Sequence, residues 1–321
     1  MRILFMGTPD FAVPCLQALI DNQYNVIGVV TQPDRPKGRK LQLAPPPVKV
    51  LAEQYNIPVY QPEKISKREE VERFQQLDID LVVTAAFGQI LSNDFLAIPK
   101  LGCINVHASL LPKYRGGAPI HWSVINGETE TGVTIMYMVQ KLDAGPMLTQ
   151  KKVAILPTDT TGIVYEKVTQ AGAELLIETL PDLIAGRLNP VEQTESEATF
   201  AYNICREDER IDWDKPAITI YNQIRGLNPW PGAYTYYQNQ VLKVWASEIY
   251  PMNRNQSMEE NDTKEDIPGM IVRIDKNGIV VATGAGYLLL TELQPAGKKK
   301  ILGKDFVNSG KVLIKDILGK E

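Results

Sequence analysis

The first 30 residues constrain the fold more than any other stretch, because a strand, a helix and a second strand follow one another directly. Arg2–Met6 is a short apolar run that ends at Gly7. Ala12–Asp21 has the pattern of a helix, and Val26–Val30 is a second apolar run. Two parallel strands joined by a helix form a right-handed βαβ unit. The chain is therefore predicted to start with a doubly wound, Rossmann-like α/β domain.

The turn after the first strand indicates whether this domain binds a dinucleotide. Its sequence, Gly7-Thr-Pro-Asp-Phe-Ala12, lacks the G-x-G-x-x-G spacing that lets the backbone approach a pyrophosphate. A dinucleotide site is therefore not expected here. The same domain is predicted to continue with strands at 57–60, 80–86 and 133–138, and with helices at 48–54, 66–76 and 158–186.

The character of the chain changes near Leu188, where a polar segment without periodicity begins. Such a segment is typical of a linker. The acidic run 259–266 is interpreted as a solvated loop. A short helix and five short strands are predicted at 219–225, 233–237, 241–245, 269–274, 278–283 and 287–291, and their spacing favours a small β-barrel. The predicted organisation is a first domain at 1–189, a linker at 190–208 and a second domain at 209–321.

The formal net charge of −4 excludes a basic surface that covers the whole molecule, but it does not exclude local basic patches. One such patch is the Pro- and Gly-rich loop Thr31–Pro47. It contains one acidic residue, Asp34, and four basic residues: Arg35, Lys37, Arg39 and Lys40. Two interpretations remain open: a solvated loop, or a basic arm that contacts phosphates and becomes ordered on binding.

Three polar residues form the candidate catalytic group. Asn105 and His107 lie two residues apart at the end of a predicted strand and so point to the same face, at the sheet edge where ligands bind. Asp143 lies in a later turn that can close over this edge. An amide donor suits a developing oxyanion, and a carboxylate favours a protonated imidazole. The set suits acyl transfer to an external nucleophile without a metal or a covalent intermediate. A core histidine and a surface aspartate are the alternative.

The remaining candidate residues are interpreted as structural. His121 lies in a helix predicted after Pro119 and has no second histidine at metal-ligand spacing. The three cysteines, Cys15, Cys103 and Cys205, are too scattered for a zinc site or a disulfide framework. No apolar run reaches the ~18 residues of a membrane span, and the first ten residues lack a signal-peptide pattern. A cytoplasmic protein with reduced thiols is expected.

Several short motifs carry a resemblance to a known family. The motifs at 105–107, 109–112, 115–116 and 142–145 (Asn-Val-His, Ser-Leu-Leu-Pro, Arg-Gly and Leu-Asp-Ala-Gly) resemble the active-site pattern of the 10-formyltetrahydrofolate-dependent formyltransferases. Further motifs at 6–11, 32–36, 199–203 and 225–230 are similar to the members that formylate methionyl initiator tRNA, so the resemblance covers nearly the whole chain. Phe87 stands where many members have tyrosine, and the aromatic ring is kept.

This resemblance implies both a fold and a reaction. The domain at 1–189 would bind 10-formyltetrahydrofolate and transfer its formyl group to the α-amino group of methionyl initiator tRNA. Asn105 and a protonated His107 would stabilise the tetrahedral oxyanion, while Asp143 would keep His107 charged and manage proton transfer through water. The second domain would be an OB-like barrel that helps to hold tRNA. A monomer that needs no metal is expected.

The resemblance also implies two groups of binding residues. The folate-contacting group consists of Phe87, Gly88, Ser109, Leu110, Leu111 and Pro112. The tRNA-contacting group combines the four basic residues of the loop 31–47 with a basic turn in the second domain, Lys298, Lys299 and Lys300. A merely solvated turn is the alternative for these three lysines.

Two other functions remain as alternatives. The first is formyl transfer to the amine of a sugar nucleotide, because a related formyltransferase shares the core and a similar barrel. The basic loop, the region at 230–232 and the absence of a fused second enzyme domain argue against it. The second is an RNA-binding module on a catalytically dead scaffold. The complete set of Asn105, His107 and Asp143 argues against that interpretation.

Overall fold

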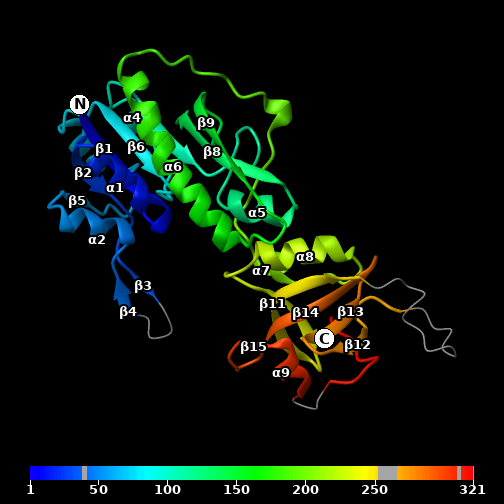
Figure 1. The fold of residues 1–321 in the computed structure, drawn as a ribbon. Helices are drawn as coiled ribbons and strands as arrows, with labels where there is room; N and C mark the ends of the chain where they lie inside the picture. Colours follow the sequence, from blue (N-terminus) through cyan, green and yellow to red (C-terminus); the bar gives the residue numbers. More distant parts are fainter. Residues whose placement is uncertain (38–41, 252–265, 309–311, 321) are drawn as a thin grey trace. The chain divides into compact units, whose positions relative to one another are not determined.

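The computed structural model describes residues 1–37, 42–251, 266–308 and 312–320, and the chain forms two compact units (Figure 1). The first unit comprises Met1–Pro119, Glu130–Ala154 and Tyr165–Tyr202. The second comprises Ile120–Thr129, Ile155–Val164 and Asn203–Glu321. The domain limits predicted from the sequence, 1–189 and 209–321, differ in kind from these discontinuous units and remain a proposal.

A seven-stranded mixed sheet forms the centre of the first unit. Its strand order is β5-β2-β1-β6-β7-β8-β9, in which the pairs from β5 to β7 are parallel and β8 and β9 run antiparallel to their neighbours. The strands are β1 (Arg2–Gly7), β2 (Asn25–Val30), β5 (Val59–Tyr60), β6 (Leu81–Ala85), β7 (Cys103–His107), β8 (Glu130–Tyr137) and β9 (Met147–Ala154). Strands β1 and β6 are continuous apolar runs because both of their faces are buried.

Helices lie on both faces of this sheet, as a doubly wound fold requires. One face carries a core cluster in which Leu4 and Val82 pack with Phe74 of α3 and Phe95 of α4. The other face is covered by α6, where a Cβ at Gly172 would meet Val106 Cγ1 at 3.1 Å. The helices that complete the unit are η1 (Asp10–Ala12), α1 (Val13–Asp21), α2 (Pro47–Gln54), α3 (Arg68–Gln75), α4 (Asn93–Leu96), α6 (Thr161–Ile184) and η2 (Glu195–Glu197).

The basic loop is more regular than its composition indicates. A two-stranded antiparallel hairpin pairs β3 (Arg35–Lys37) with β4 (Gln42–Ala44), two strands that the sequence did not predict. The base of the hairpin is anchored at Asp34, whose carboxylate accepts hydrogen bonds from Gln61 Nε2 at 2.6 Å and from Lys49 Nζ at 2.9 Å. These two hydrogen bonds lower the pKa of Asp34 below its usual value. Local pairing was missed because short strands without apolar alternation give no periodic signal.

An antiparallel sheet forms the second unit, with strand order β10-β11-β14-β13-β12 and β15 paired to β14. All five predicted strands are present, and β11 and β14 extend further than predicted. The strands are β10 (Ala233–Tyr237), β11 (Gln240–Tyr250), β12 (Ile271–Asp275), β13 (Gly278–Ala282), β14 (Tyr287–Pro295) and β15 (Ile301–Leu302). The helices are α5 (Pro119–Ile125), α7 (Arg206–Glu209), α8 (Ala217–Gly226) and α9 (Gly303–Asn308). Residues 259–265 of the expected acidic loop lie outside the described residues.

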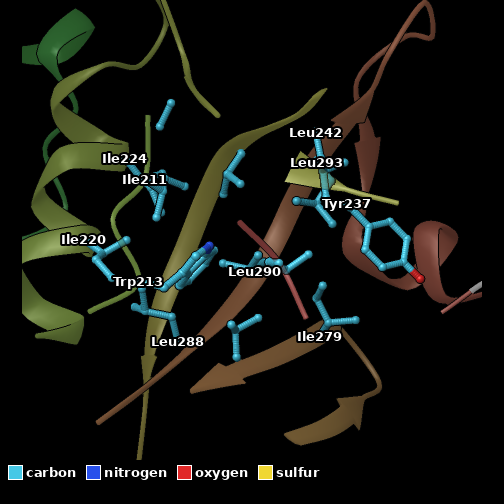
Figure 2. Close-up of a cluster of buried hydrophobic side chains, with 14 of the residues drawn as sticks. Ile211, Trp213, Ile220, Ile224, Tyr237, Leu242, Ile279, Leu288, Leu290 and Leu293 are labelled. Atoms are coloured by element: carbon cyan, nitrogen blue, oxygen red, sulfur yellow. The ribbon is translucent and has the colours of Figure 1, made fainter. Parts of the chain in front are cut away.

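The core of the second unit is a cluster of buried side chains from α8 and the sheet (Figure 2). Leu288, Leu290 and Leu293 of β14 contribute to it together with Ile220 and Ile224 of α8. The buried Trp213 lies among them, and its indole Nε1 donates to Thr235 Oγ1 at 2.9 Å. The only polar atom of this indole is therefore satisfied inside an apolar cluster.

The segment expected to be a linker packs on the first unit over most of its length. Val191 pairs with Met147, and Phe200 pairs with Arg115. Up to Tyr202 the segment clusters with the first unit, and from Asn203 it clusters with the second. Most polar side chains at 192–197 are exposed, and those of Gln193 and Glu195 bond to other parts of the first unit.

Candidate active site

Strand β7 brings Asn105 and His107 to the sheet edge next to β6, where Thr84 pairs with Asn105. Asn105 is half-buried, and His107, the last residue of the strand, is only 6% exposed. The two side chains lie on the same face of the strand because successive residues alternate. A donor amide and an imidazole are thereby held side by side on a rigid element.

The amide of Asn105 is oriented by a neighbouring hydroxyl. Thr84 Oγ1 donates to Asn105 Oδ1 at 2.7 Å. With its oxygen occupied in this way, Asn105 has a free Nδ2 donor: no described residue forms a hydrogen bond with it, and it is not sealed from solvent. A free N–H beside the imidazole is the arrangement that stabilises a developing oxyanion.

The imidazole of His107 lies between a carboxylate and a carbonyl. Its Nδ1 is 3.7 Å from Asp143 Oδ2, within ion-pair range but beyond hydrogen-bond length. Its Nε2 is 3.1 Å from the carbonyl oxygen of Tyr114. Because a carbonyl only accepts, Nε2 carries a hydrogen in this arrangement. A second proton on Nδ1 would face Asp143 and would make an ion pair with it.

Asp143 is presented by the loop between β8 and β9. Its carboxylate Oδ2 accepts a hydrogen bond from the backbone N–H of Gly116 at 2.8 Å, and its backbone has φ +46°. Close packing also restricts the loop at Gly145, where a Cβ would lie 1.9 Å from Tyr137 O. The structure thus places the carboxylate beside His107 from a point about forty residues further along the chain.

The predicted folate-contacting residues at 109–112 form a tightly bonded turn after β7. Ser109 is fully buried, and its hydroxyl donates to Lys113 O at 2.6 Å. Leu111 N donates to Thr134 Oγ1 at 3.1 Å, and Leu111 O accepts from Gln150 Nε2 at 2.8 Å. The Leu111–Pro112 peptide is cis. The Ser109 hydroxyl therefore serves the turn itself, and contact of this stretch with folate remains a prediction.

Phe87 and Gly88 lie at the end of β6. The Phe87 ring is 5% exposed and belongs to the core cluster under α3 and α4. Its carbonyl accepts hydrogen bonds from Thr8 Oγ1 at 3.0 Å and from Gln32 Nε2 at 3.1 Å. Gly88 has φ +86°, a conformation that favours glycine. These two residues shape the backbone at the sheet edge, and a direct folate contact remains a prediction for them as well.

The predicted tRNA-contacting residues fall into two separate groups. In the hairpin, Arg35 is exposed and forms an ion pair with Glu63 at 2.7 Å, and Lys37 ends β3. Arg39 and Lys40 lie outside the described residues. In the second unit, Lys298, Lys299 and Lys300 are exposed in the turn between β14 and β15.

The three lysines of this turn differ in their contacts. Lys300 Nζ is 3.3 Å from Glu292 Oε2 and 4.5 Å from the centre of the Trp245 ring. Among the described residues, neither Lys298 nor Lys299 has an ion-pair partner for its side chain. Two cations are thus available to a ligand, whereas the third is partly neutralised.

The interpretation of His121, Cys15 and Cys103 as structural agrees with their buried or half-buried surroundings, whereas Cys205 is exposed. His121 Nε2 lies 3.3 Å from Trp230 O, and burial lowers the pKa of this histidine. Burial raises the pKa of the Cys15 and Cys103 thiols to about 12. Within the described ranges, no group of three or more His, Cys, Asp or Glu side chains is placed to hold a metal ion. None of the helices described combines the length and apolar composition needed to cross a membrane.

Sequence reasoning missed three residues of the site: Thr84, Tyr114 and Gln193. Thr84 carried a weak signal, since it is the one polar residue within the buried strand β6. Tyr114 acts through its backbone carbonyl, so its side-chain type holds no information about the contact. Gln193 lies in the segment expected to be a linker and carried no signal. Its side-chain amide nonetheless donates to the backbone of the Asp143 loop.

Comparison with known proteins gives consistent matches over both units. The model of the formyl transferase family matches residues 1–180, and that of the formyl transferase C-terminal domain matches residues 203–311. The chain is 57% identical to a methionyl-tRNA formyltransferase of Bacillus velezensis and 56% identical to one of Bacillus subtilis, over 99% of this chain and 98% of each relative. A solved structure of WlaRD, a sugar 3N-formyltransferase, has a similar fold with a TM-score of 0.65 at 19% identity, covering 93% of this chain and 99% of that one.

Proposed function

Because the chain belongs to the formyl transferase family and is more than half identical to methionyl-tRNA formyltransferases over nearly its whole length, we propose that it formylates methionyl initiator tRNA. The formyl group comes from 10-formyltetrahydrofolate, and the product is N-formylmethionyl-tRNA for translation initiation. The observation that carries this proposal is the identity across both units, including the second, which lies outside the candidate active site.

The hydrogen-bond donors of the candidate site suit the transfer of a formyl group. 10-Formyltetrahydrofolate supplies an activated formyl carbon, which the α-amino nitrogen attacks to form a tetrahedral oxyanion. The bond from carbon to N10 breaks when this intermediate collapses. Asn105 Nδ2 is free to donate to the formyl oxygen as negative charge develops on it. The amine loses one proton and N10 gains one, so no net proton is released. In this proposal Asp143, beside His107, passes the proton between them through a water molecule.

His107 contributes charge to the same oxyanion. Asp143 Oδ2 stands 3.7 Å from its Nδ1, within ion-pair range of a protonated ring. The Nε2 hydrogen is held by Tyr114 O at 3.1 Å, so the bound formyl oxygen must compete with this carbonyl for it. In this proposal Asn105 is the donor available from the outset, and the imidazolium adds positive charge.

The second unit is proposed to be an OB-like barrel that holds tRNA together with the basic hairpin. The all-antiparallel sheet and the exposed lysines Lys298 and Lys299 support this. OB folds commonly bind nucleic acid through exposed strands and loops. The protein is proposed to act as a monomer in the cytoplasm. The folate is proposed to lie against Gly88 and the turn 109–112, next to Asn105.

The reaction itself is the decisive test. The protein is incubated with 10-formyltetrahydrofolate and methionyl initiator tRNA, and N-formylmethionine is measured after the ester is hydrolysed. We expect formylated product, and we expect none from a sugar-nucleotide amine in a parallel reaction. Formylation of the sugar nucleotide in place of the tRNA would replace the proposal by a sugar N-formyltransferase.

Removing the charge of the basic hairpin is expected to weaken tRNA binding. Changing Arg35, Lys37, Arg39 and Lys40 to glutamine removes cations that would displace counterions from phosphates. The slope of log K against log salt is negative, and each phosphate that is no longer neutralised should make it less negative by about 0.7–0.9. Filter binding of tRNA at several salt concentrations measures the slope, and folate affinity should stay unchanged.

A charge-matched control separates the effect of where these cations lie from the effect of the lower net charge. Four exposed cations elsewhere in the first unit are changed to glutamine: Arg68, Lys100, Lys152 and Arg187. This control should bind tRNA with nearly the original salt slope. Equal slopes for the hairpin variant and the control would leave the hairpin without a role in phosphate binding.

A further inference from the structure

The segment 191–201 holds the loop that carries Asp143. The contact is centred on Gln193, a half-buried residue in a stretch that has the composition of a linker. Its amide Nε2 donates to Asp143 O and to Gly145 O, both at 2.8 Å. One side chain thus bonds the backbone on both sides of Ala144. These two carbonyls flank the point at which the loop turns toward His107.

The orientation of the Gln193 amide is determined by Arg115. Arg115 is fully buried, and its Nε donates to Gln193 Oε1 at 3.0 Å. If the amide were turned over, its NH₂ would face the guanidinium and its oxygen would face two carbonyl oxygens. Both contacts would then be repulsive. Arg115 therefore keeps the Gln193 donors directed at the loop.

A second link joins the same segment to the start of the loop. Glu195 accepts from Arg115 Nη1 at 3.0 Å and from Lys141 Nζ at 2.6 Å. The bond to Lys141 ties the segment to the loop before Asp143. The bond to Arg115 and the pairing of Phe200 with Arg115 tie the segment to the stretch after β7. Hydrogen bonds to Lys141 and Arg115 lower the pKa of Glu195, so it stays ionised.

The conformation of Asp143 explains why its loop needs support. Its φ of +46° is a left-handed conformation that residues other than glycine adopt at a cost. The carboxylate is held by Gly116 N and lies 3.7 Å from His107 Nδ1, so a small shift of the backbone changes both distances. Strained residues persist where the surrounding bonds over-determine them. Here the bonds to the carbonyls of residues 143 and 145 supply that restraint.

We propose that Gln193 is a positioning residue for the formyl transfer reaction, which acts by holding the Asp143 loop beside His107. This inference rests on the proposed function for its kinetic consequences. Gln193 donates to backbone carbonyls and does not touch His107 or Asn105. Its removal is therefore expected to affect turnover through Asp143 and to leave the binding of both substrates in place.

The test uses the full-length protein with two variants and a matched control. Gln193→Met keeps the length of the side chain and removes both donors. Gln193→Glu keeps an acceptor for Arg115 but directs an oxygen at the two carbonyls. Gln170→Met makes the same chemical change at an exposed position on α6, where the Gln170 side chain bonds Glu174. We expect kcat to fall about 10- to 100-fold in both Gln193 variants, with KM within about twofold, because a misplacement of about 1 Å can cost 10²-fold.

A double-mutant cycle separates positioning from general destabilisation. If Gln193 acts through Asp143, adding Gln193→Met to Asp143→Asn should lower kcat by less than about twofold. A full additional loss in that background would overturn the proposal, as would a normal kcat in both Gln193 variants. If Gln193→Met folds poorly, the same cycle is measured with Gln193→Glu.

Amide hydrogen exchange tests whether Gln193 holds the loop without relying on the formylation reaction. Peptides that cover Lys141–Pro146 and Gly116 should exchange faster in Gln193→Met than in the wild type or in Gln170→Met. Unchanged exchange would overturn the inference even if the kinetics changed. A wild-type protein that yields no formylmethionyl-tRNA would overturn the proposed function instead, while the exchange data would still decide whether Gln193 holds the loop.

Discussion

Replacing His107 by alanine is expected to lower kcat for formylation about 100-fold or more, while the affinities for folate and tRNA change little. The imidazole interacts with the oxyanion only as the oxyanion forms, so its loss raises the barrier without weakening binding of the ground state. Groups with such roles typically contribute ~10²–10⁴ in rate. Single-turnover formylation with saturating substrates measures the effect.

The other histidine provides the control for this experiment. His121 belongs to the second unit and contacts Trp230 O, so His121→Ala should leave kcat within about threefold, as expected for a residue outside the reacting group. Binding of folate to His107→Ala shows whether the site remains folded. Near-normal turnover of His107→Ala would remove this residue from the mechanism and leave Asn105 as the main source of stabilisation.

Replacing Leu290 by alanine is expected to lower the free energy of unfolding of the second unit by about 2–5 kcal/mol. Leu290 is fully buried in the cluster of Figure 2, and its strand β14 pairs with β11, β13 and β15. The substitution removes apolar packing and leaves a cavity that the surrounding strands cannot fill. Urea unfolding followed by tryptophan fluorescence measures the effect, because Trp213 lies in the same cluster.

An exposed leucine in the same unit supplies the comparison. Leu313 is 65% exposed, so Leu313→Ala should change the free energy of unfolding by no more than about 0.5 kcal/mol. Both variants shorten a leucine to alanine, so the difference between their free energies of unfolding measures the contribution of burial. Similar unfolding midpoints for both variants would mean that the β14 core contributes little to the stability of this unit.

Much of the fold follows from local patterns in the sequence. Strands β1 and β6 were predicted because a strand buried on both faces is a continuous apolar run. Strand β9 was missed because it lies at the sheet edge and includes Lys151 and Lys152, which are incompatible with a buried run. The hairpin of β3 and β4 was missed because its strands carry charges and prolines in place of apolar alternation.

The candidate site was predictable only where residues are close in sequence. The separation of two residues between Asn105 and His107 implies a shared face on any strand. The contact of His107 with Asp143 depends on how the loop after β8 folds, which spacing cannot specify. Gln193 lay beyond prediction, because a glutamine that bonds backbone carbonyls leaves no periodic or compositional trace. Arg115 stood in a motif of the resemblance, but its bond to Gln193 could not be read from the sequence.

The sequence by itself determined that Asn105 and His107 share the end of a strand in an α/β domain, since alternation and apolar runs are local properties of the chain. Only the tertiary structure decided which groups complete the site. The carboxylate of Asp143 reaches His107 because Gly116 N–H holds its oxygen and Gln193 holds its backbone. These interactions join residues far apart in sequence, and their geometry depends on hydrogen bonds that exist only after the chain has folded.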